Sequence, residues 1–314
     1  MSSRERPANL LTLREALPIA EHGGYALGSF SPRYAAMIRP VLQSAERARS
    51  PLIVQISSNE FRRYSITPQE FAAEFFAQFD AIGVSVPVVL HLDHTKDMAT
   101  IATAIEAGFT SVMIDASELA LEANIAQSRA AALYAHAHGA SVEAELGRIG
   151  TTDRIETDED VELYTDPDEA AAFVAATGVD ALAVSVGTAH GVYVVRQPKI
   201  DFDRLRAIRS RTPVHLVLHG GSGVPATMVA EAIRLPAGGV SKVNIATDLE
   251  QAALAALGGA ARMTNAEMNE LSEEQRERAR AAVADCVRDK VENYLGSAGK
   301  ADDTAWREAR TFKP

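Results

Sequence analysis

Hydrophobic residues recur along the chain in short runs, and most runs are followed by a longer stretch in which apolar positions return every three or four residues. Short apolar or β-branched runs between polar turns are typical of buried strands, and the three-to-four-residue repeat is typical of helices. The pattern predicts strands at 25–30, 52–56, 88–92, 111–114, 141–146, 181–186, 214–218 and 240–245. It predicts helices that include 68–82, 99–107, 121–138, 166–177, 203–211 and 225–235.

The alternation of strands and helices indicates a parallel sheet. Eight successive units with strands apolar on both faces fit a closed (β/α)8 TIM barrel better than an open doubly wound sheet. We therefore predict one domain over residues 1–314, with a barrel at about 20–260 and a C-terminal helical extension at 261–314. In that extension, residues 273–294 have the pattern of one long charged helix. Such a helix could cap the barrel or meet another subunit, and the sequence leaves both open.

Composition narrows the classes of partner. Hydrophobic residues make up 47% and charged residues 23%, as in ordinary globular proteins. A formal net charge of −11 disfavours nucleic acid as a partner, and an anionic substrate would need a local positive site. The sequence has no apolar run near the roughly 18 residues that span a bilayer, and its polar start lacks the apolar core of a signal peptide. We expect a cytoplasmic protein without a membrane partner.

Histidines follow three of the predicted strands. His94, His190 and His219 come just after the third, sixth and seventh strands. Because the carboxyl ends of barrel strands converge, we expect these three side chains to face one another. Three imidazoles with an open fourth position form a recurring catalytic zinc site. We interpret the other histidines as surface, helix or strand-packing residues: His22, His91, His136, His138 and His215.

A glycine-rich turn follows His219 and suggests an anion. Gly220, Gly221, Ser222 and Gly223 precede a predicted helix, so backbone N–H groups and a hydroxyl could face a phosphate. Such a turn alone is more often structural, but the loops after strands seven and eight are the usual phosphate position in these barrels. At the end of strand eight, two polar residues could add hydrogen bonds to a phosphate or a substrate hydroxyl, namely Asn244 and Thr247.

Asp93 directly precedes His94 and is the candidate acid–base group. Zinc can polarise a carbonyl while a nearby carboxylate moves a proton. Neighbouring side chains on a strand point to opposite sides, so both residues reach one site only if the chain turns there. The alternative is that Asp93 caps a helix ahead of Thr95.

Six motifs together resemble class II fructose- and tagatose-bisphosphate aldolases, and the similarity spans nearly the whole chain. They read HLDH, GFTSVMID, SVEAELG, GTAHG, HGGSG and KVNIAT, at 91–94, 108–115, 141–147, 187–191, 219–223 and 242–247. The resemblance implies zinc on His94, His190 and His219, with Glu145 and, as a further candidate, Asp115 contacting metal in a second position. It makes Asp93 the proton donor and acceptor.

The same resemblance implies how substrate is held. Dihydroxyacetone phosphate would be bound by Gly191, Gly220, Ser222, Asn244 and Thr247, and Ser57 matches the substrate-facing serine of the family. A monovalent cation is a further candidate cofactor. The resemblance also implies a homodimer or homotetramer.

Three positions depart from the family pattern. Ser31 stands where the family usually has asparagine, and Asp153 aligns with the glutamate of its mobile loop, the proposed base. Val194 replaces a lysine close to the phosphate. We infer that the donor half is retained while the acceptor differs, so that a ketose 1-phosphate is as admissible as a 1,6-bisphosphate.

The sequence thus predicts a zinc-dependent aldolase that cleaves a phosphorylated ketose to dihydroxyacetone phosphate and an aldehyde. Two other classes stay open: a metal-dependent hydrolase or isomerase on the same barrel, and a noncatalytic or regulatory aldolase-like subunit. The phosphate-binding turn favours the aldolase over the first. Retention of Asp93 and of three histidines argues against the second.

Overall fold

Eight parallel strands close into a barrel in chain order in the computed structural model, which describes residues 5–149, 164–191, 193 and 198–311. The first strand pairs with both the second and the eighth, which closes the barrel. The prediction of a (β/α)8 barrel with additional helices is confirmed. The strands are β1 (Leu27–Phe30), β2 (Leu52–Ser57), β3 (Val88–Thr95), β4 (Ser111–Ile114), β5 (Ser141–Leu146), β6 (Ala181–Val184), β7 (His215–Leu218) and β8 (Val240–Ile245).

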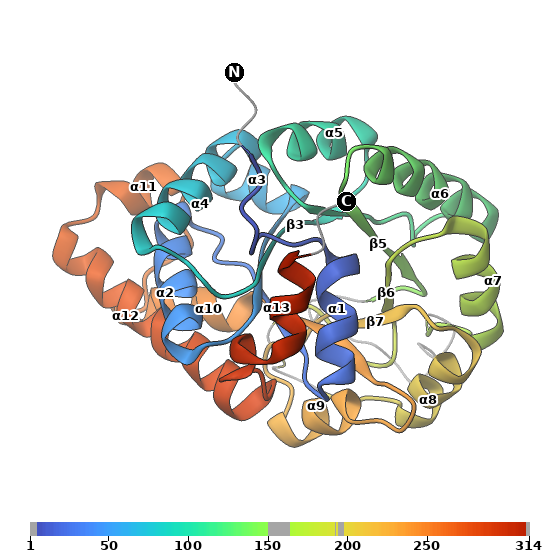
Figure 1. Ribbon diagram of the computed structural model, residues 1–314. Coiled ribbons are helices and arrows are strands. Elements are labelled where there is room, and N and C mark those ends of the chain that lie inside the picture. The colour runs from blue at the N-terminus through green and yellow to red at the C-terminus, as the bar shows by residue number, and fades with distance from the viewer. Residues whose placement is uncertain (1–4, 150–163, 192, 194–197, 312–314) are drawn as a thin grey trace.

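Helices surround the barrel (Figure 1). Those before and between the strands are α1 (Leu13–His22), the 3-10 turn η1 (Ala35–Met37), α2 (Ile38–Ala48), α3 (Ser58–Tyr64), α4 (Pro68–Ile82), α5 (Met98–Ala107), α6 (Leu121–Ala137), α7 (Pro167–Thr177), α8 (Phe202–Arg211) and α9 (Ala226–Ile233). After β8 come α10 (Thr247–Ala256), α11 (Asn265–Glu270), α12 (Glu273–Asp289), the π-helical turn η3 (Lys290–Tyr294), the 3-10 turn η4 (Lys300–Asp302) and α13 (Thr304–Thr311). None of the helices in the described ranges is both long and apolar enough to cross a membrane.

The amino-terminal end of the barrel is apolar and closed. Side chains from the strands form one buried cluster there with Leu13 and Leu17 of α1 and with Trp306 of α13. The indole N–H of Trp306 donates to the hydroxyl of Tyr25 at 2.9 Å. Figure 1 shows α1 and α13 side by side across this end. Among the described residues, this cluster fills the amino-terminal end of the barrel, so we look for the site at the carboxyl ends of the strands, where catalytic groups of such barrels gather.

Five of the eight strands carry a polar inward residue nearer the open end, because alternate side chains of a strand face the same side. Ser29, Gln55, His91, Glu143 and Lys242 are all almost completely buried inside the barrel. The interior is thus layered, with apolar residues at the closed end and a buried polar layer beneath the open end.

The charged helix predicted over 273–294 does not cap the barrel. Helix α12 packs against α2 and α10 on the outer surface, and η3 continues it as a π-helical turn. That turn directs the Tyr294 hydroxyl to the carbonyl oxygen of Gly221, to which it donates a hydrogen bond. The extension therefore supports the turn after β7 from outside.

Candidate active site

The chain turns sharply at the end of β3. His94 has φ of +36°, which is rare for a residue with a side chain, and the pairing of β3 with β4 shifts register between Leu92 and Thr95. This irregularity lets Asp93 and His94 both face the barrel opening, although neighbours on a regular strand would point apart. The condition for Asp93 and His94 to share one site is met.

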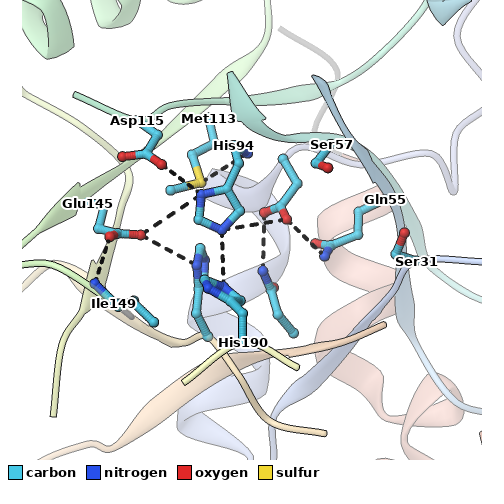
Figure 2. Close-up of polar contacts among 12 residues, drawn as sticks. Ser31, Gln55, Ser57, His94, Met113, Asp115, Glu145, Ile149 and His190 are labelled. Atoms are coloured by element: carbon cyan, nitrogen blue, oxygen red, sulfur yellow. Dashed lines mark hydrogen bonds and ion pairs between the residues drawn. The ribbon is translucent and has the colours of Figure 1, made fainter. Parts of the chain in front are cut away.

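The three predicted histidines come together. One ring nitrogen from each of His94, His190 and His219 lies within 4.8 Å of the others. The Nε2 atoms of His94 and His190 are 3.3 Å apart. A dashed line marks this contact in Figure 2. Two nitrogens bound at about 2.0–2.1 Å to one tetrahedral zinc ion would lie roughly 3.3 Å apart, so this spacing suits a shared metal.

Carboxylates orient two of these rings. Asp115 Oδ2 lies 2.9 Å from His94 Nδ1, which leaves His94 Nε2 facing His190. Glu143 Oε1 lies 2.8 Å from His219 Nε2. His219 Nδ1 is buried and has no hydrogen-bond partner among the described residues. Metal-binding histidines usually give their other N–H to a carboxylate in this way.

Burial and the charges of neighbouring side chains shift the pKa values of the three histidines in different directions. Burial alone would lower the pKa of His94, but Asp93, Asp115 and Glu145 together raise it to about 10. Burial and the neighbouring histidines lower the pKa of His190 to about 3. Burial, followed by His94, lowers the pKa of His219 well below its ordinary value. Of the three rings, His94 is therefore the one that favours the protonated form at neutral pH, and the other two favour the neutral form.

Glu145 lies beside the histidine cluster. Its Oε2 lies 3.6 Å from His219 Nδ1 and 4.0 Å from His94 Nδ1, and it has no hydrogen-bond partner among the described residues. Burial, followed by the charge of Asp115, raises the pKa of Glu145 to about 8. An unsatisfied carboxylate oxygen and an unsatisfied imidazole nitrogen in one buried cluster fit a bound cation, because buried polar atoms rarely stay without a partner. His94, Asp115 and Glu145 also form a second group with metal-ligand spacing.

Asp93 is held by amides on both sides. Gln55 Nε2 donates to Asp93 Oδ2 at 3.2 Å, and Asn244 Nδ2 donates to Asp93 Oδ1 at 3.1 Å. The hydroxyl of Ser29 donates to Gln55 Oε1, which directs the amide N–H₂ group of Gln55 toward Asp93. The Asp93 side chain lies 3.9 Å from His94 Nε2, beside the histidine cluster rather than in a helix cap.

The glycine-rich turn after β7 packs against the loop that carries His190. A Cβ atom on Gly220, which has φ of +65°, would lie 2.3 Å from the carbonyl oxygen of Ala189. A Cβ on Gly221 would lie 2.5 Å from Val243. Only glycine allows this approach, which places the turn beside the histidine cluster.

Ser222 has a role that the sequence did not indicate. Its Oγ accepts from the backbone N–H groups of Ala246 and Asp248, at 3.3 and 3.2 Å, and so caps the start of α10. The hydroxyl proton of Ser222 can still donate to a ligand, since a hydroxyl both accepts and donates. Thr247, the first residue of α10, lies between Ala246 and Asp248, whose N–H groups donate to Ser222.

The remaining predicted positions are only partly described. Ser57 accepts from Glu60 N as the N-cap of α3, and Gly191 directly follows His190 with φ of +111°. Ser31 donates to Glu60 Oε2 at 2.8 Å. Asp153 and Val194 lie outside the described residues.

Sequence reasoning missed the supporting polar layer. His91 was interpreted as a packing residue, but its Nε2 lies 3.4 Å from Lys242 Nζ, which donates to Glu143 Oε2 at 2.7 Å. Gln55 was passed over as part of a strand. The available signal was polar residues at alternate positions of otherwise apolar strands, which predicts an inward polar layer.

Comparisons with known proteins give the class of enzyme. Residues 11–300 match the family model described as fructose-bisphosphate aldolase class II. The chain belongs to the class II fructose-bisphosphate aldolase family. It is therefore an aldolase, a lyase that makes or breaks a carbon–carbon bond, and enzymes of this family depend on a metal ion.

Solved structures agree with this class II aldolase assignment. The YdjI aldolase from Escherichia coli K12 is 32% identical, with a TM-score of 0.77, over 93% of this chain and all of that one. A Coccidioides immitis protein, provisionally assigned as a fructose-1,6-biphosphate aldolase, is 29% identical, with a TM-score of 0.76, over 92% of this chain and 98% of that one. A fructose-bisphosphate aldolase from Campylobacter jejuni, 22% identical over 91% of this chain and 95% of that one, shares the fold with a TM-score of 0.72.

Proposed function

We propose that this aldolase is zinc-dependent and cleaves a ketose 1-phosphate reversibly to dihydroxyacetone phosphate and an unphosphorylated aldehyde. The observation that carries the metal assignment is the arrangement of His94, His190 and His219, with one nitrogen of each within 4.8 Å of the others. Three histidines with access for substrate are a recurrent catalytic zinc arrangement. When bound there, zinc would supply a positive charge that polarises the substrate carbonyl.

Asp93 is the proposed acid–base residue. During cleavage, the hydroxyl on the carbon that becomes the aldehyde loses its proton as the carbon–carbon bond breaks. Asp93 can take that proton, because its carboxylate lies beside the histidine cluster and is held by the amides of Gln55 and Asn244. In the direction of bond formation it returns the proton to the new hydroxyl. For Asp153, aligned with the family's loop glutamate, we propose the role of base toward the donor ketone.

The donor phosphate is proposed to bind at the turn after β7 and the start of α10. Backbone N–H groups at Gly220 and Gly191 and the hydroxyl proton of Ser222 would meet its oxygens, with Thr247 at the amino end of α10. Helix amino termini favour anions because their first N–H groups point outward and carry partial positive charge. This is the local positive character that a protein of net charge −11 needs for an anionic substrate.

The acceptor side supports an unphosphorylated aldehyde. Ser31, which replaces the usual asparagine, donates a hydrogen bond from its hydroxyl to Glu60 Oε2. Arg33, two residues later, is buried and paired with both Glu60 and Glu250. These two buried carboxylates balance the charge of Arg33 inside the protein, so Arg33 is not available to bind a second phosphate.

The proposal is tested by measuring dihydroxyacetone phosphate released from a ketose 1-phosphate by zinc-loaded protein. We expect release that stops when a chelator removes the metal and returns when zinc is restored. His190→Ala should abolish both stoichiometric zinc binding and release. Stoichiometric zinc without cleavage of any phosphorylated ketose would contradict the proposed activity, and full activity after metal removal would contradict the zinc centre.

Family membership supports three further expectations. We expect a homodimer or a homotetramer, a monovalent cation near the donor phosphate, and a cytoplasmic location. The mass of the protein in solution tests the first. Dependence of activity on potassium or sodium, at constant ionic strength, tests the second.

A further inference from the structure

A chain of hydrogen-bonded side chains crosses the barrel interior beneath the three histidines. It runs from Ser111 through His91, Lys242 and Glu143 to His219, and all five residues are completely buried. The His91 Nδ1 atom lies 2.8 Å from Ser111 Oγ, and its Nε2 faces Lys242 Nζ at 3.4 Å. Because an ammonium group only donates, His91 Nε2 must accept from Lys242. We refer to these five residues as the buried polar chain.

The ion pair in this chain is costly to bury. Lys242 Nζ donates to Glu143 Oε2 at 2.7 Å in the middle of the barrel, with neither side chain exposed. A buried ion pair often contributes less to stability than well-packed apolar residues of similar volume, because both charges lose their hydration. Apolar side chains fill the layer immediately below. Packing alone therefore gives no reason for a lysine and a glutamate at this position.

The geometry gives them another task. Glu143 Oε2 is engaged by Lys242, so Oε1 is left to accept from His219 Nε2, at 2.8 Å. With the proton of His219 on Nε2, its Nδ1 carries a lone pair. That Nδ1 is buried, has no hydrogen-bond partner among the described residues, and lies 3.6 Å from Glu145 Oε2.

We propose that Lys242 and Glu143 are positioning residues for the metal centre, which hold His219 in the tautomer and orientation that present Nδ1 to the metal. Lys242 acts on His219 through Glu143. Its Nζ also lies 3.9 Å from Asp93 Oδ1, beyond hydrogen-bond distance, and an ammonium group has no lone pair with which to bind a metal. The inference rests on the proposed function, because it requires the three histidines to bind zinc. It adds residues that support this site from inside the barrel.

The test is zinc affinity, measured by competition with a chelating dye at fixed pH, together with the visible absorption spectrum of the cobalt-substituted protein. Glu143→Gln and Lys242→Met should each weaken zinc binding about tenfold or more, in the range found for outer partners of metal ligands. The cobalt spectrum should change in both variants, because one ligand is no longer held in place. Arg209→Met is the matched control.

Arg209 is also a buried cation paired with a carboxylate, Glu21, but it donates to the carbonyls of Thr212 and Val214 at the amino end of β7. His219 lies beyond the opposite end of that strand. Replacing Arg209 with methionine should therefore lower the stability of the protein without changing zinc affinity or the cobalt spectrum.

A double variant separates positioning from folding. Lys242→Met combined with Glu143→Leu removes both buried charges, so the metal-free protein should keep a Tm closer to that of the original protein than either single variant does. Its zinc affinity should still be about tenfold weaker or worse. Original affinity and cobalt spectrum in the folded double variant would overturn the proposal. If the original protein itself bound no zinc, the proposed zinc centre would be wrong. That result differs from zinc binding that is unaffected by the variants, which would overturn only the positioning role of Lys242 and Glu143.

Discussion

His94 combines an unusual backbone conformation with a central place in the site. A positive φ in a residue with a side chain costs free energy, and such strain persists where the surrounding structure imposes it, often at functional sites. Here it turns the end of β3 so that Asp93 and His94 both face the barrel opening. The side chains of two adjacent residues can therefore serve different tasks, metal binding and proton transfer.

Replacing Asp93 should separate these tasks. Asp93→Ala removes the proposed proton carrier but leaves the three histidines, so kcat should fall by about 10²–10⁴-fold, the usual contribution of a general acid–base group. Zinc stoichiometry should stay at the original value. The two measurements are steady-state cleavage and metal analysis of the same preparation. Near-normal kcat in a zinc-loaded Asp93→Ala protein would assign proton transfer to another group.

Metal binding should release a proton. The raised pKa of His94, about 10, means that this ring is protonated at neutral pH before metal arrives. A metal must displace that proton, so zinc affinity should rise with pH through the neutral range and weaken as pH falls. Calorimetric titration with zinc in buffers of different ionisation enthalpy measures the number of protons released. An affinity that does not change between pH 6 and 8 would contradict a protonated His94.

At the scale of elements, the predicted strands matched closely where an apolar run ended in polar turn residues. The strands at 111–114, 141–146 and 240–245 have the predicted bounds. Helix α1 is not among the helices predicted from the sequence, and it contains Pro18, a residue that normally breaks a helical pattern. The capping box of Thr12 and Glu15 was the signal that could have identified its start.

Gly220, in the turn after β7, should tolerate no side chain. Gly220→Ala would place a Cβ 2.3 Å from Ala189 O and displace the loop that carries His190. We expect weaker zinc binding and lower kcat. Gly83→Ala is the matched control, because Gly83 has a similar φ of +68° but its Cβ would meet nothing within 4 Å. If both variants lose the same stability and neither loses zinc affinity, the close approach at Gly220 does not support the site.

The closed end of the barrel should affect stability rather than catalysis. Trp306→Ala removes a fully buried side chain that packs against α1 in the apolar cluster. The free energy of unfolding of this variant should be lower by about 3–5 kcal/mol. Denaturant unfolding of the metal-free protein measures this loss. Since the site lies at the other end, kcat of the folded variant should stay near the original value. A large loss of kcat without loss of stability would link α13 to the site.

At the scale of the whole molecule, the barrel divides stability and chemistry between its ends. The sequence predicted the convergence of His94, His190 and His219 because strand order alone brings strand ends together. It did not predict that Glu143 and Lys242 meet across the interior, because which inward side chains touch depends on the stagger and tilt of the closed barrel. The orientation of His219 likewise depends on a partner 76 positions away in the chain.

The most direct test of the account is a panel of ketose 1-phosphates and ketose 1,6-bisphosphates incubated with zinc-loaded protein. Dihydroxyacetone phosphate release is coupled to NADH consumption, with chelator-treated and Asp93→Ala proteins as controls. We predict that at least one ketose 1-phosphate is cleaved with a higher kcat/KM than fructose or tagatose 1,6-bisphosphate. Chelator treatment should abolish cleavage, and Asp93→Ala should lower kcat by about 10²–10⁴-fold. Much faster cleavage of a 1,6-bisphosphate than of every 1-phosphate would contradict the proposed acceptor.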